Sequence, residues 1–260
     1  MTIVSLTTDF GTTDPFVGIM KGVIASRAPQ TRVIDVTHGI PPQDVLAGAL
    51  VLRHAAPYFP PQTIHVGVVD PGVGGTRRPL CVETASGFLV GPDNGLLSLA
   101  APLRELRRII HLTEERFFLS PRSATFDGRD VFAPVAAALA VGVAPSSLGL
   151  EVPDMQRIDL PPVVAEARVL RGQVIYVDHF GNLVTNVPGE ALAALPRQDL
   201  SIGIRTARLR GVARSYGAVA PGEPVVVVNS WGLLEIAVRD GSAQASLGAR
   251  VGDAVVIETP

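Results

Sequence analysis

The chain has 260 residues, of which 47% are hydrophobic and 18% are charged, and its formal net charge is -2 at pH 7. This length allows one large domain or two modest ones, each with its own core. The near-neutral charge gives no electrostatic basis for binding a nucleic-acid backbone or an anionic membrane. Because no apolar run reaches the roughly 20 residues of a membrane-spanning helix, the composition predicts a globular protein that binds neither nucleic acid nor membrane.

The start of the chain and the cysteine content bear on location. Met1 to Thr8 runs directly into a strand-like pattern, without the basic segment and cleavage site of a signal peptide. Cys81 is the only cysteine, which excludes an internal disulfide, and its apolar strand favours a buried, unreactive thiol. Together these features predict a cytoplasmic protein.

The first part of the chain alternates short apolar strands with helical patterns. Asp14 and Pro15 are expected to begin a helix as its N-cap and first helical residue. Strands are predicted at residues 3–6, 32–36, 63–69, 80–83, 88–90 and 108–112, and further helices at 44–55 and 129–141. This alternation predicts an α/β domain over residues 1–162, with a largely parallel central sheet flanked by helices.

After about Pro162 the chain changes to short strands separated by Gly and Pro turns. The predicted strands lie at residues 167–177, 201–209, 225–229, 233–238 and 254–258, with one short helical candidate at 190–194. This pattern predicts an all-β domain over residues 163–260, either a barrel or a sandwich. The Pro-rich stretch 153–164 is the predicted linker.

Polar segments follow several of the predicted strands. In open α/β sheets, ligands bind at the carboxyl ends of the strands. Such segments lie at 9–14, 70–77 and 91–94, and another at 126–130 precedes a helix. Each alone is compatible with ordinary turn chemistry, but their joint placement indicates a site. In the C-terminal part the unusual segments are 178–186 and 229–238, and the first could equally be a tight hairpin with Gly181 at positive φ.

Several common kinds of site are absent from the sequence. There is no GxxxxGK[ST] phosphate loop and no GxSxG nucleophile elbow. Arg77 occupies the third glycine position of a dinucleotide-binding pattern. The histidines lack paired metal spacing, so no metal site is predicted. His54 and His65 are interpreted as structural, whereas His38 and His179 stay open.

Seven motifs, in order, resemble those of the S-adenosyl-L-methionine (SAM) hydroxide adenosyltransferases, which are SAM hydrolases related to the SAM-dependent fluorinase and chlorinase. The motifs are TTDFGTTDPFVGIMKG, VIDVTHGIPPQD, VVDPGVGGTRR, VGPDNGLLS, TFDGRDVFAP, DHFGNLVTN and NSWGLLEIAV. The resemblance implies an α/β domain, a C-terminal β-barrel and a homotrimer whose active sites lie between the N-terminal domain of one subunit and the C-terminal domain of its neighbour. It also implies that SAM and water give adenosine and L-methionine, without a cofactor.

The resemblance also implies roles for residues that hold SAM. Asp9 matches the carboxylate that binds both ribose hydroxyls, and Asp178 matches the acceptor for the methionine ammonium. Asn182 matches the side chain that reads an adenine edge, and Ser230 lies where a donor meets the methionine carboxylate. The remaining matches are Phe180 and Tyr216, which would flank the adenine, the stretch from Glu235 to Val238, which would close over it, and Trp231, which stands where the halogenases carry arginine.

Asp70 and Arg77 match two members of the Asp-Arg-His set with which the hydrolases are thought to handle water. The third member differs, because Asp127 stands where the family pattern has histidine. A carboxylate can still accept a proton from water. Near Asp70, however, the two negative charges would be coupled unless Arg77 or Arg129 lies between them.

Two alternatives to hydrolysis remain open. A halogenase would need to desolvate a halide, yet Asp70 stands where the halogenases have tyrosine. Val73 and Gly128 also replace the threonine and serine of the fluorinase. The other alternative is a non-catalytic sensor of SAM or adenosine that lost its water chemistry through Asp127.

Overall fold

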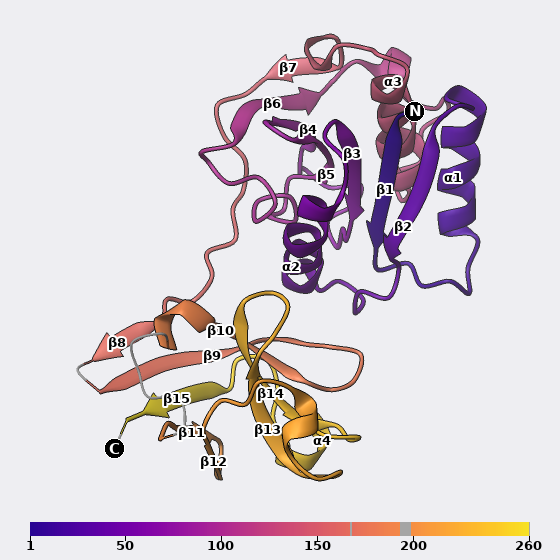
Figure 1. The fold of residues 1–260 in the computed structure, drawn as a ribbon. Coiled ribbons are helices and arrows are strands. Elements are labelled where there is room, and N and C mark those ends of the chain that lie inside the picture. The colour runs from indigo at the N-terminus through magenta and orange to yellow at the C-terminus, as the bar shows by residue number, and fades with distance from the viewer. Residues whose placement is uncertain (167, 193–198, 260) are drawn as a thin grey trace. The chain divides into compact units, whose positions relative to one another are not determined.

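The computed structural model describes residues 1–166, 168–192 and 199–259 (Figure 1). The chain divides into two compact units, Met1–Ile158 and Asp159–Pro260. The boundary predicted from the sequence lies between residues 162 and 163. Both boundaries fall within the Pro-rich stretch 153–164. Among the described residues, no helix combines the length and the apolar character needed to cross a bilayer.

The N-terminal unit contains one mixed sheet in the strand order β2-β1-β3-β5-β4-β6-β7. The strands are β1 (Ile3–Thr8), β2 (Arg32–Thr37), β3 (Thr63–Val68), β4 (Pro79–Thr84), β5 (Gly87–Pro92), β6 (Leu106–Leu112) and β7 (Gly149–Glu151). Strands β2, β1, β3 and β5 pair in parallel, as the sequence predicted for the sheet. Their carboxyl ends therefore lie at one edge of the sheet.

The prediction of a largely parallel sheet is wrong for the other pairings. Strand β4 runs antiparallel to both β5 and β6, and β7 runs antiparallel to β6. Only Ala85 and Ser86 separate β4 from β5. A connection of two residues permits a hairpin, whereas a parallel pair needs a crossover of a dozen or more residues.

Three longer helices cover the sheet: α1 (Phe16–Arg27), α2 (Val45–Ala55) and α3 (Ala133–Ala140). A π-helical turn, η3 (Gly128–Phe132), leads directly into α3, so the helix predicted at 129–141 has two geometries. Asp44 caps α2 by accepting a hydrogen bond from Ala47 N. The predicted cap of α1 is wrong, because the N-cap is Pro15 and no side chain caps that helix. Short 3-10 turns occur at η1 (Ala56–Tyr58), η2 (Glu115–Phe117) and η4 (Pro145–Ser147).

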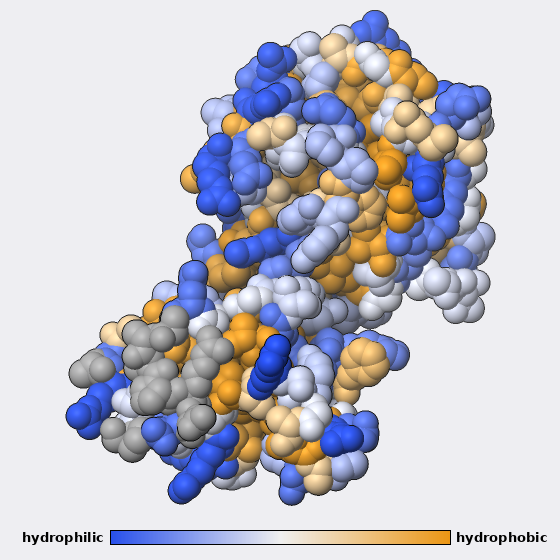
Figure 2. Space-filling view, in the orientation of Figure 1, coloured by the Kyte–Doolittle hydropathy of each residue, from blue (hydrophilic) through white to orange (hydrophobic). Residues whose placement is uncertain are grey.

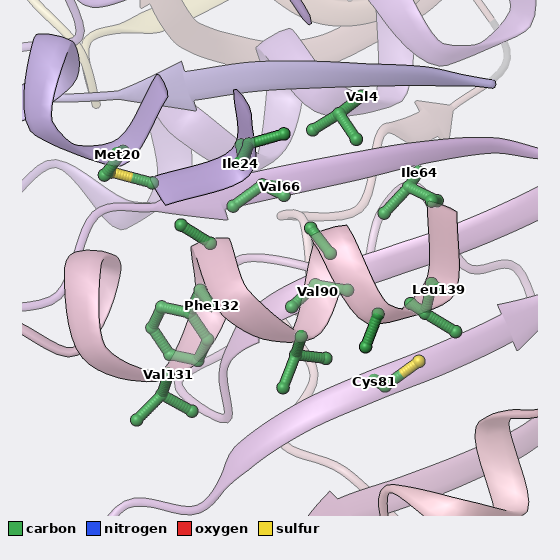
Figure 3. Packing of buried hydrophobic residues seen from close by; sticks show 14 of the residues in the cluster. Val4, Met20, Ile24, Ile64, Val66, Cys81, Val90, Val131, Phe132 and Leu139 are labelled. Carbon is green, nitrogen blue, oxygen red and sulfur yellow. The ribbon is translucent and has the colours of Figure 1, made fainter. Parts of the chain in front are cut away.

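Helices α1 and α3 pack on one face of the sheet. Figure 3 shows Met20 and Ile24 of α1 and the η3–α3 residues Phe132 and Leu139 around Val66 of β3. Fully burying side chains of this size stabilises a fold by about 1.5–3 kcal/mol each. This core fixes the relative positions of the ends of β1, β3 and η3.

Helix α2 packs on the other face, where it approaches the sheet closely. A Cβ at Gly48 would lie 2.7 Å from a methyl group of Leu96, and one at Gly67 of β3 would lie 2.8 Å from a methyl group of Leu52. Glycine at both positions therefore permits the close contact between helix and sheet. The result is a helix–sheet–helix arrangement, as the sequence predicted.

The C-terminal unit is built around an antiparallel sheet in the order β12-β11-β15-β9-β10-β14-β13, with β8 beside β9. The strands are β8 (Val164–Glu166), β9 (Val169–Val177), β10 (Leu183–Pro188), β11 (Ser201–Ile204), β12 (Ala207–Arg210), β13 (Pro224–Val228), β14 (Leu233–Val238) and β15 (Ala254–Glu258). A bridge between Ala213, just after β12, and Val227 of β13 brings the two ends of this order together. The sheet is therefore nearly closed into a barrel.

Two features of this unit differ from the prediction. The strand predicted at 201–209 is a hairpin of β11 and β12, with Arg205 at φ 50° in the turn. The unit is also not purely β, because α4 (Ala243–Leu247) follows Ser242, whose side chain accepts a hydrogen bond from Ala245 N. A helix of five residues is too short to show a helical period in the sequence.

In the described part of the C-terminal unit there are also two 3-10 turns, η5 (Gly189–Leu192) and η6 (Tyr216–Ala218). The first coincides with the start of the helix predicted at 190–194, and residues 193–194 lie outside the described part of the chain. Inside the unit, Val174, Leu183, Leu234 and Ile236 belong to its buried core. Figure 2 shows hydrophilic residues interspersed with apolar ones on the visible face of both units.

Candidate active site

Asp9 follows directly after β1, at the carboxyl end of that strand. Its Oδ2 accepts a hydrogen bond of 2.8 Å from the backbone nitrogen of Gln43, in the loop between β2 and α2. Gln43 has a left-handed backbone with φ 67°, and Gly11 N donates to His38 O across the same pair of loops at 2.8 Å. The loops after β1 and β2 thus hold the half-buried Asp9 carboxylate in place.

Asp70 and Arg77 form a buried ion pair at the carboxyl end of β3. Arg77 Nε lies 3.1 Å and 3.0 Å from the two carboxylate oxygens of Asp70, and Arg77 Nη2 lies 2.5 Å from Asp70 Oδ2. The side chains of Arg77 and Asp70 are 9% and 5% exposed. A bidentate pair of this kind fixes the orientation of both groups.

Asp127 joins this pair from the other side of the guanidinium. Arg77 Nη2 donates to Asp127 Oδ2 at 2.5 Å, and the side chain of Asp127 is 2% exposed. Burial lowers the pKa of Arg77, but its hydrogen bonds to Asp70 and Asp127 outweigh burial and raise the pKa above its ordinary value. Arg77 therefore stays cationic between the two carboxylates.

A second arginine, Arg122, also binds Asp127. Its Nε donates to Asp127 Oδ1 at 3.0 Å and its Nη2 donates to Asp127 Oδ2 at 3.0 Å. Arg129 takes no part, because it binds its neighbour Asp130 at 2.6 Å and 2.9 Å. Of the two arginines expected to separate Asp70 from Asp127, Arg77 is the one that does so.

These carboxylates line a cavity of about 440 Å³ in the N-terminal unit. Asp9, Asp70 and Asp127 form its polar side. Its apolar side comes from Phe10, Phe16 and Phe126, whose ring centroids lie 5.3–5.9 Å apart. A cavity with grouped carboxylates and an aromatic wall suits a ligand that combines hydroxyl or cationic groups with an apolar part.

A neighbouring hollow of about 390 Å³ shares Asp127 with this cavity and is also lined by Gly74, Arg77 and Arg122. Gly74 has φ +76°, and a Cβ there would lie 2.2 Å from Ala124 O. Glycine is therefore required where the loop of Asp70 and Arg77 meets the segment that carries Arg122 and Asp127.

In the C-terminal unit, residues 178–182 form the turn between β9 and β10. Gly181 has φ 81°, as expected for a tight hairpin. Asp178 Oδ1 accepts hydrogen bonds from Phe180 N at 2.9 Å and Asn182 N at 2.8 Å, and its Oδ2 accepts one from Asn182 Nδ2 at 2.9 Å. The turn holds Asp178 as an ordered carboxylate, and Oδ2, which accepts only one of these bonds, keeps lone-pair capacity for a further donor.

Asp178 and Asn182 line a second cavity, of about 480 Å³, together with Phe180, Tyr216 and Val238. Phe180 is 72% exposed and Tyr216 is 44% exposed, although both are large aromatic residues. Exposed aromatic rings beside a carboxylate and an amide suit a planar heterocycle with polar edges.

Glu235 lies behind Tyr216 and is buried. Its Oε1 accepts a hydrogen bond of 2.8 Å from Tyr216 Oη, and its Oε2 accepts one of 2.9 Å from Asn229 Nδ2. Burial and the hydrogen bond to Glu235 raise the pKa of Tyr216, which therefore remains a donor. Glu235 positions the Tyr216 ring and is not among the residues lining the cavity.

Ser230 and Trp231 lie in the turn between β13 and β14 and do not line either of these cavities. Asn229 Oδ1 accepts a hydrogen bond of 2.9 Å from Trp231 N. The Trp231 ring lies 5.2 Å from that of Tyr176 on β9. Five of the predicted substrate-binding residues in this unit line one cavity: Asp178, Phe180, Asn182, Tyr216 and Val238. The other three, Ser230, Trp231 and Glu235, do not line it.

Cys81, His38 and His65 do not line these cavities. Burial raises the pKa of Cys81 to about 12, in keeping with an unreactive thiol. His65 Nδ1 lies 2.6 Å from Ser5 Oγ, and burial lowers the pKa of His65 to about 4. His38 Nδ1 lies 2.9 Å from Thr8 Oγ1. Within residues 1–166, 168–192 and 199–259, no group of three or more His, Cys, Asp or Glu side chains could hold a metal ion.

Sequence reasoning missed three contributions to the site. Arg122 lies outside the motifs, and nothing in its sequence surroundings marks it. The aromatic wall was detectable in principle, because Phe10, Phe16 and Phe126 each fall inside a motif already noted. Gln43 acts through its backbone nitrogen, which side-chain motifs do not report.

Comparison with known proteins identifies the family of this chain. The SAM hydroxide adenosyltransferase N-terminal domain matches residues 4–149, and the corresponding C-terminal domain matches residues 172–256. The (R)-S-adenosyl-L-methionine hydrolase of Salinispora tropica is 45% identical over 254 residues, which cover 96% of this chain and 95% of that protein. The protein of the same name from Thermus thermophilus is 41% identical and covers 94% of each chain.

This chain is also similar to a more distant relative and to a solved structure. A fluorinase from an Actinoplanes species is 27% identical over 90% of each chain. The crystal structure of an uncharacterized conserved protein from Thermotoga maritima has a TM-score of 0.90 and 34% identity, and the match covers 98% of this chain and 99% of that one. Because both domains match and close relatives cover nearly the whole length, the chain belongs to the SAM hydroxide adenosyltransferase family.

Proposed function

We propose that this protein hydrolyses SAM to adenosine and L-methionine. The observation that carries the proposal is the buried cluster of Asp70, Arg77 and Asp127 beside a cavity that Asp9 also lines. Relatives named (R)-S-adenosyl-L-methionine hydrolase, 39–45% identical to this chain, support it. The enzyme class follows from the family. We further propose which residue binds each group of the substrate.

Asp9 would bind the ribose of SAM. A carboxylate can accept hydrogen bonds from two neighbouring hydroxyls at once, and Asp9 is half-buried with one oxygen already oriented by Gln43 N. Its position beside Asp70 and Asp127 would bring the ribose C5′ near the ion-pair cluster. The proposed site therefore needs no large movement of β1 or β3.

The cavity of the C-terminal unit offers groups for the rest of SAM. Asp178 would accept hydrogen bonds from the methionine ammonium, and Asn182 would bind an adenine edge. Phe180 and Tyr216 would contact the adenine faces, since both rings are exposed there. Val238 would also contact the adenine, and Glu235 would hold the Tyr216 ring in place. Ser230 and the backbone of Trp231 would bind the methionine carboxylate.

The proposed step is a displacement at C5′ of the ribose. A water oxygen forms a bond to C5′ while the C5′–S bond breaks, and the electron pair of that bond returns to sulfur. Sulfur leaves as the neutral thioether of methionine, so the leaving group needs no general acid. Because water is a poor nucleophile, it must be oriented and must lose a proton during the step.

The cluster provides groups for this task. Asp70 would orient the water and favour the cationic sulfonium, Arg77 would stabilise developing hydroxide, and Asp127 would accept the proton. At 4 Å, two unit charges interact by about 4 kcal/mol at an effective dielectric constant of about 20, which is enough to matter for the sulfonium beside Asp70 and for developing hydroxide beside Arg77. We propose that the reaction needs no cofactor, and dialysis against a chelator should leave the rate unchanged.

Halogenation is disfavoured by two features of the cavity. Asp70, Asp127 and Asp9 all line it, and desolvating a halide beside carboxylates is unfavourable. A Cβ at Gly128, where the fluorinase has serine, would lie 3.1 Å from Met20 Sδ and from the Phe126 ring. Space for a side chain at that position is therefore limited.

Incubation of the pure protein with SAM, followed by chromatography of the products, tests the proposal. Equal amounts of adenosine and methionine are expected, and the rate should fall strongly in Asp70→Ala and Arg77→Ala. Tight binding of SAM without turnover would instead support a sensor, and a halogenated adenosine in the presence of halide would support a halogenase. The homotrimer and the cytoplasmic location stay predictions, the first of which is open to measurement of mass in solution.

A further inference from the structure

Asp127 is unusual among the carboxylates of the cavity because two arginines bind it. Arg77 and Arg122 both reach its Oδ2, at 2.5 Å and 3.0 Å, and Arg122 Nε also binds its Oδ1 at 3.0 Å. Asp70, Arg77, Asp127 and Arg122 therefore form a chain of alternating charge whose formal sum is zero. A histidine at position 127 would carry no fixed negative charge, and it would offer Arg122 no such partner.

The structure holds Arg122 firmly against Asp127. The Arg122 guanidinium lies 5.6 Å from the centroid of the Phe118 ring. The next residue, Ser123, donates its backbone N–H to Asp130 Oδ2 at 2.7 Å, and Asp130 is itself bound by Arg129. Although the Arg122 side chain is 41% exposed, its carboxylate partner is only 2% exposed. Removing Arg122 would leave a buried carboxylate with one cationic partner in place of two, which is costly.

The close meeting of two loops makes this arrangement possible. Gly74, in the loop of Asp70 and Arg77, lies against Ala124 O so closely that no side chain fits between them. Arg122 and Arg77 then line one hollow, with Asp127 between this hollow and the cavity that holds Asp9 and Asp70. Arg122 thus binds a carboxylate that lines the cavity, but it does not line the cavity itself.

We propose that Arg122 is a positioning residue for the hydrolysis: it holds the Asp127 carboxylate, and through it Arg77, in the orientation that water attack requires. This inference rests on the proposed function. Arg122 balances the second negative charge next to Asp70. Its effect should therefore depend on the identity of residue 127.

The central test compares Arg122→Ala in two backgrounds, the natural chain and Asp127→His. In the natural chain we expect kcat to fall about 10- to 100-fold, since small displacements of catalytic groups have effects of this size, while KM for SAM and Kd for adenosine change less than about twofold. In the Asp127→His background, Arg122→Ala should change kcat less than about twofold, because the carboxylate that Arg122 binds is gone.

Two further measurements separate positioning from a structural role. Low, non-denaturing guanidinium should restore part of the kcat of Arg122→Ala, whereas the same concentration of tetramethylammonium should not, and Arg122→Lys should lose less activity than Arg122→Ala. Arg116→Ala is the matched control, because Arg116 lies 5.0 Å from the Phe117 ring and pairs at 3.5 Å with Glu114, away from Asp127. It should keep the natural kcat, and thermal unfolding should show every variant folded.

An unchanged kcat in Arg122→Ala, or an equal loss in both backgrounds, would overturn the inference while the natural chain still hydrolyses SAM. If the natural chain releases no adenosine from SAM, the proposed function fails and the inference fails with it. The two failures therefore give different results in the same assay.

Discussion

Asp9 is a carboxylate whose contribution should appear in binding more than in folding. Its hydrogen bond from Gln43 N orients it at the edge of the cavity. Asp9→Asn should weaken adenosine binding about 10- to 100-fold, because hydrogen bonds to a charged acceptor contribute about 1.5–3 kcal/mol. Calorimetric titration with adenosine measures this loss.

Asp14→Asn is the matched control for that titration. Asp14 lies in the same loop and is exposed, and it does not line the cavity. Its variant should bind adenosine as the natural chain does. Equal losses in both variants would mean that the charge of the whole loop, and not the Asp9 carboxylate, governs binding.

Individual acidic residues were predictable where a strand end or a motif marked them. Asp9 and Asp70 follow strands, and the structure brings both to one cavity with Asp127. Arg122 was not predictable, because its contact with Asp127 depends on the path of the backbone between them and on no fixed spacing. The separation of Ser230 and Trp231 from the cavity lining likewise depends on the fold of a turn.

At the scale of elements, the loop after β3 must approach the segment before η3 closely. Gly74→Ala should disturb this approach, since its Cβ would meet Ala124 O at 2.2 Å and its φ of +76° is strained for alanine. We expect a loss of stability of about 1–3 kcal/mol and a larger proportional loss of kcat, as Arg77 shifts from Asp127. Urea unfolding and steady-state kinetics measure the two effects.

Gly142→Ala separates backbone strain from the collision. Gly142 has φ +92°, but its Cβ would have no atom within 4 Å. This variant should lose stability by strain alone and keep its kcat. A similar loss of kcat in Gly142→Ala would show that the loop contact at Gly74 has no special part in the site.

The contact between β1 and β3 predicts a dependence of stability on pH. Burial lowers the pKa of His65 on β3 from 6.5 to about 4, beside Ser5 on β1. The unfolded chain then binds a proton that the folded chain does not, so this contribution is complete above about pH 6.5 and is lost as pH falls toward about 4. Between about pH 7.5 and about pH 5, His65 should account for a loss of about 2 kcal/mol.

Urea unfolding of the natural chain and of His65→Gln at both pH values checks this expectation. The free energy of unfolding should fall less in His65→Gln, by the amount assigned to His65. His54, whose pKa is also lowered to about 4 by burial and by Arg53, is present in both proteins, and its contribution cancels. Parallel pH curves for the two proteins would contradict the assignment.

Long strands separated by helices were predictable from the sequence, whereas very short strands were not. Strands β1, β2 and β3 showed clear apolar runs separated by helices, which is why their parallel pairing was expected. The antiparallel pairing of β4 with β5 was predictable from the gap of two residues between them, because so short a connection permits only a hairpin. Strands β7 and β8 have only three residues each, too few for a period to be recognised.

At the scale of the whole molecule, the proposed substrate groups divide between two units. The N-terminal unit provides Asp9, Asp70 and Asp127, and the C-terminal unit provides Asp178 and Asn182. Change of composition along the sequence was enough to anticipate two units. Composition does not determine whether the two units of one site belong to the same chain or to two chains. That depends on which surfaces of the folded units are complementary.

The homotrimer predicted from the family has a distinctive consequence for mixed assemblies. Asp70→Asn and Asp178→Ala each inactivate a different half of the proposed site and should each be nearly inactive alone. If a site uses the N-terminal unit of one subunit and the C-terminal unit of its neighbour, random mixing of the two variants should restore about one quarter of the natural rate per site, since each half is intact with a chance of about one half. Every chain carries one defect, so a site made within one subunit would recover nothing.

Co-refolding of equal amounts of the two variants, with mass in solution measured alongside SAM turnover, gives the answer. Mixing without refolding is the first control, and it should stay inactive where the assembled oligomers do not exchange subunits. Co-refolding Asp70→Asn with Arg77→Ala is the second, since both defects lie in the N-terminal unit and cannot complement each other. Recovery in the first pair but not in the second requires sites shared between subunits, whereas no recovery in either pair, with a trimeric mass, places each site within one chain.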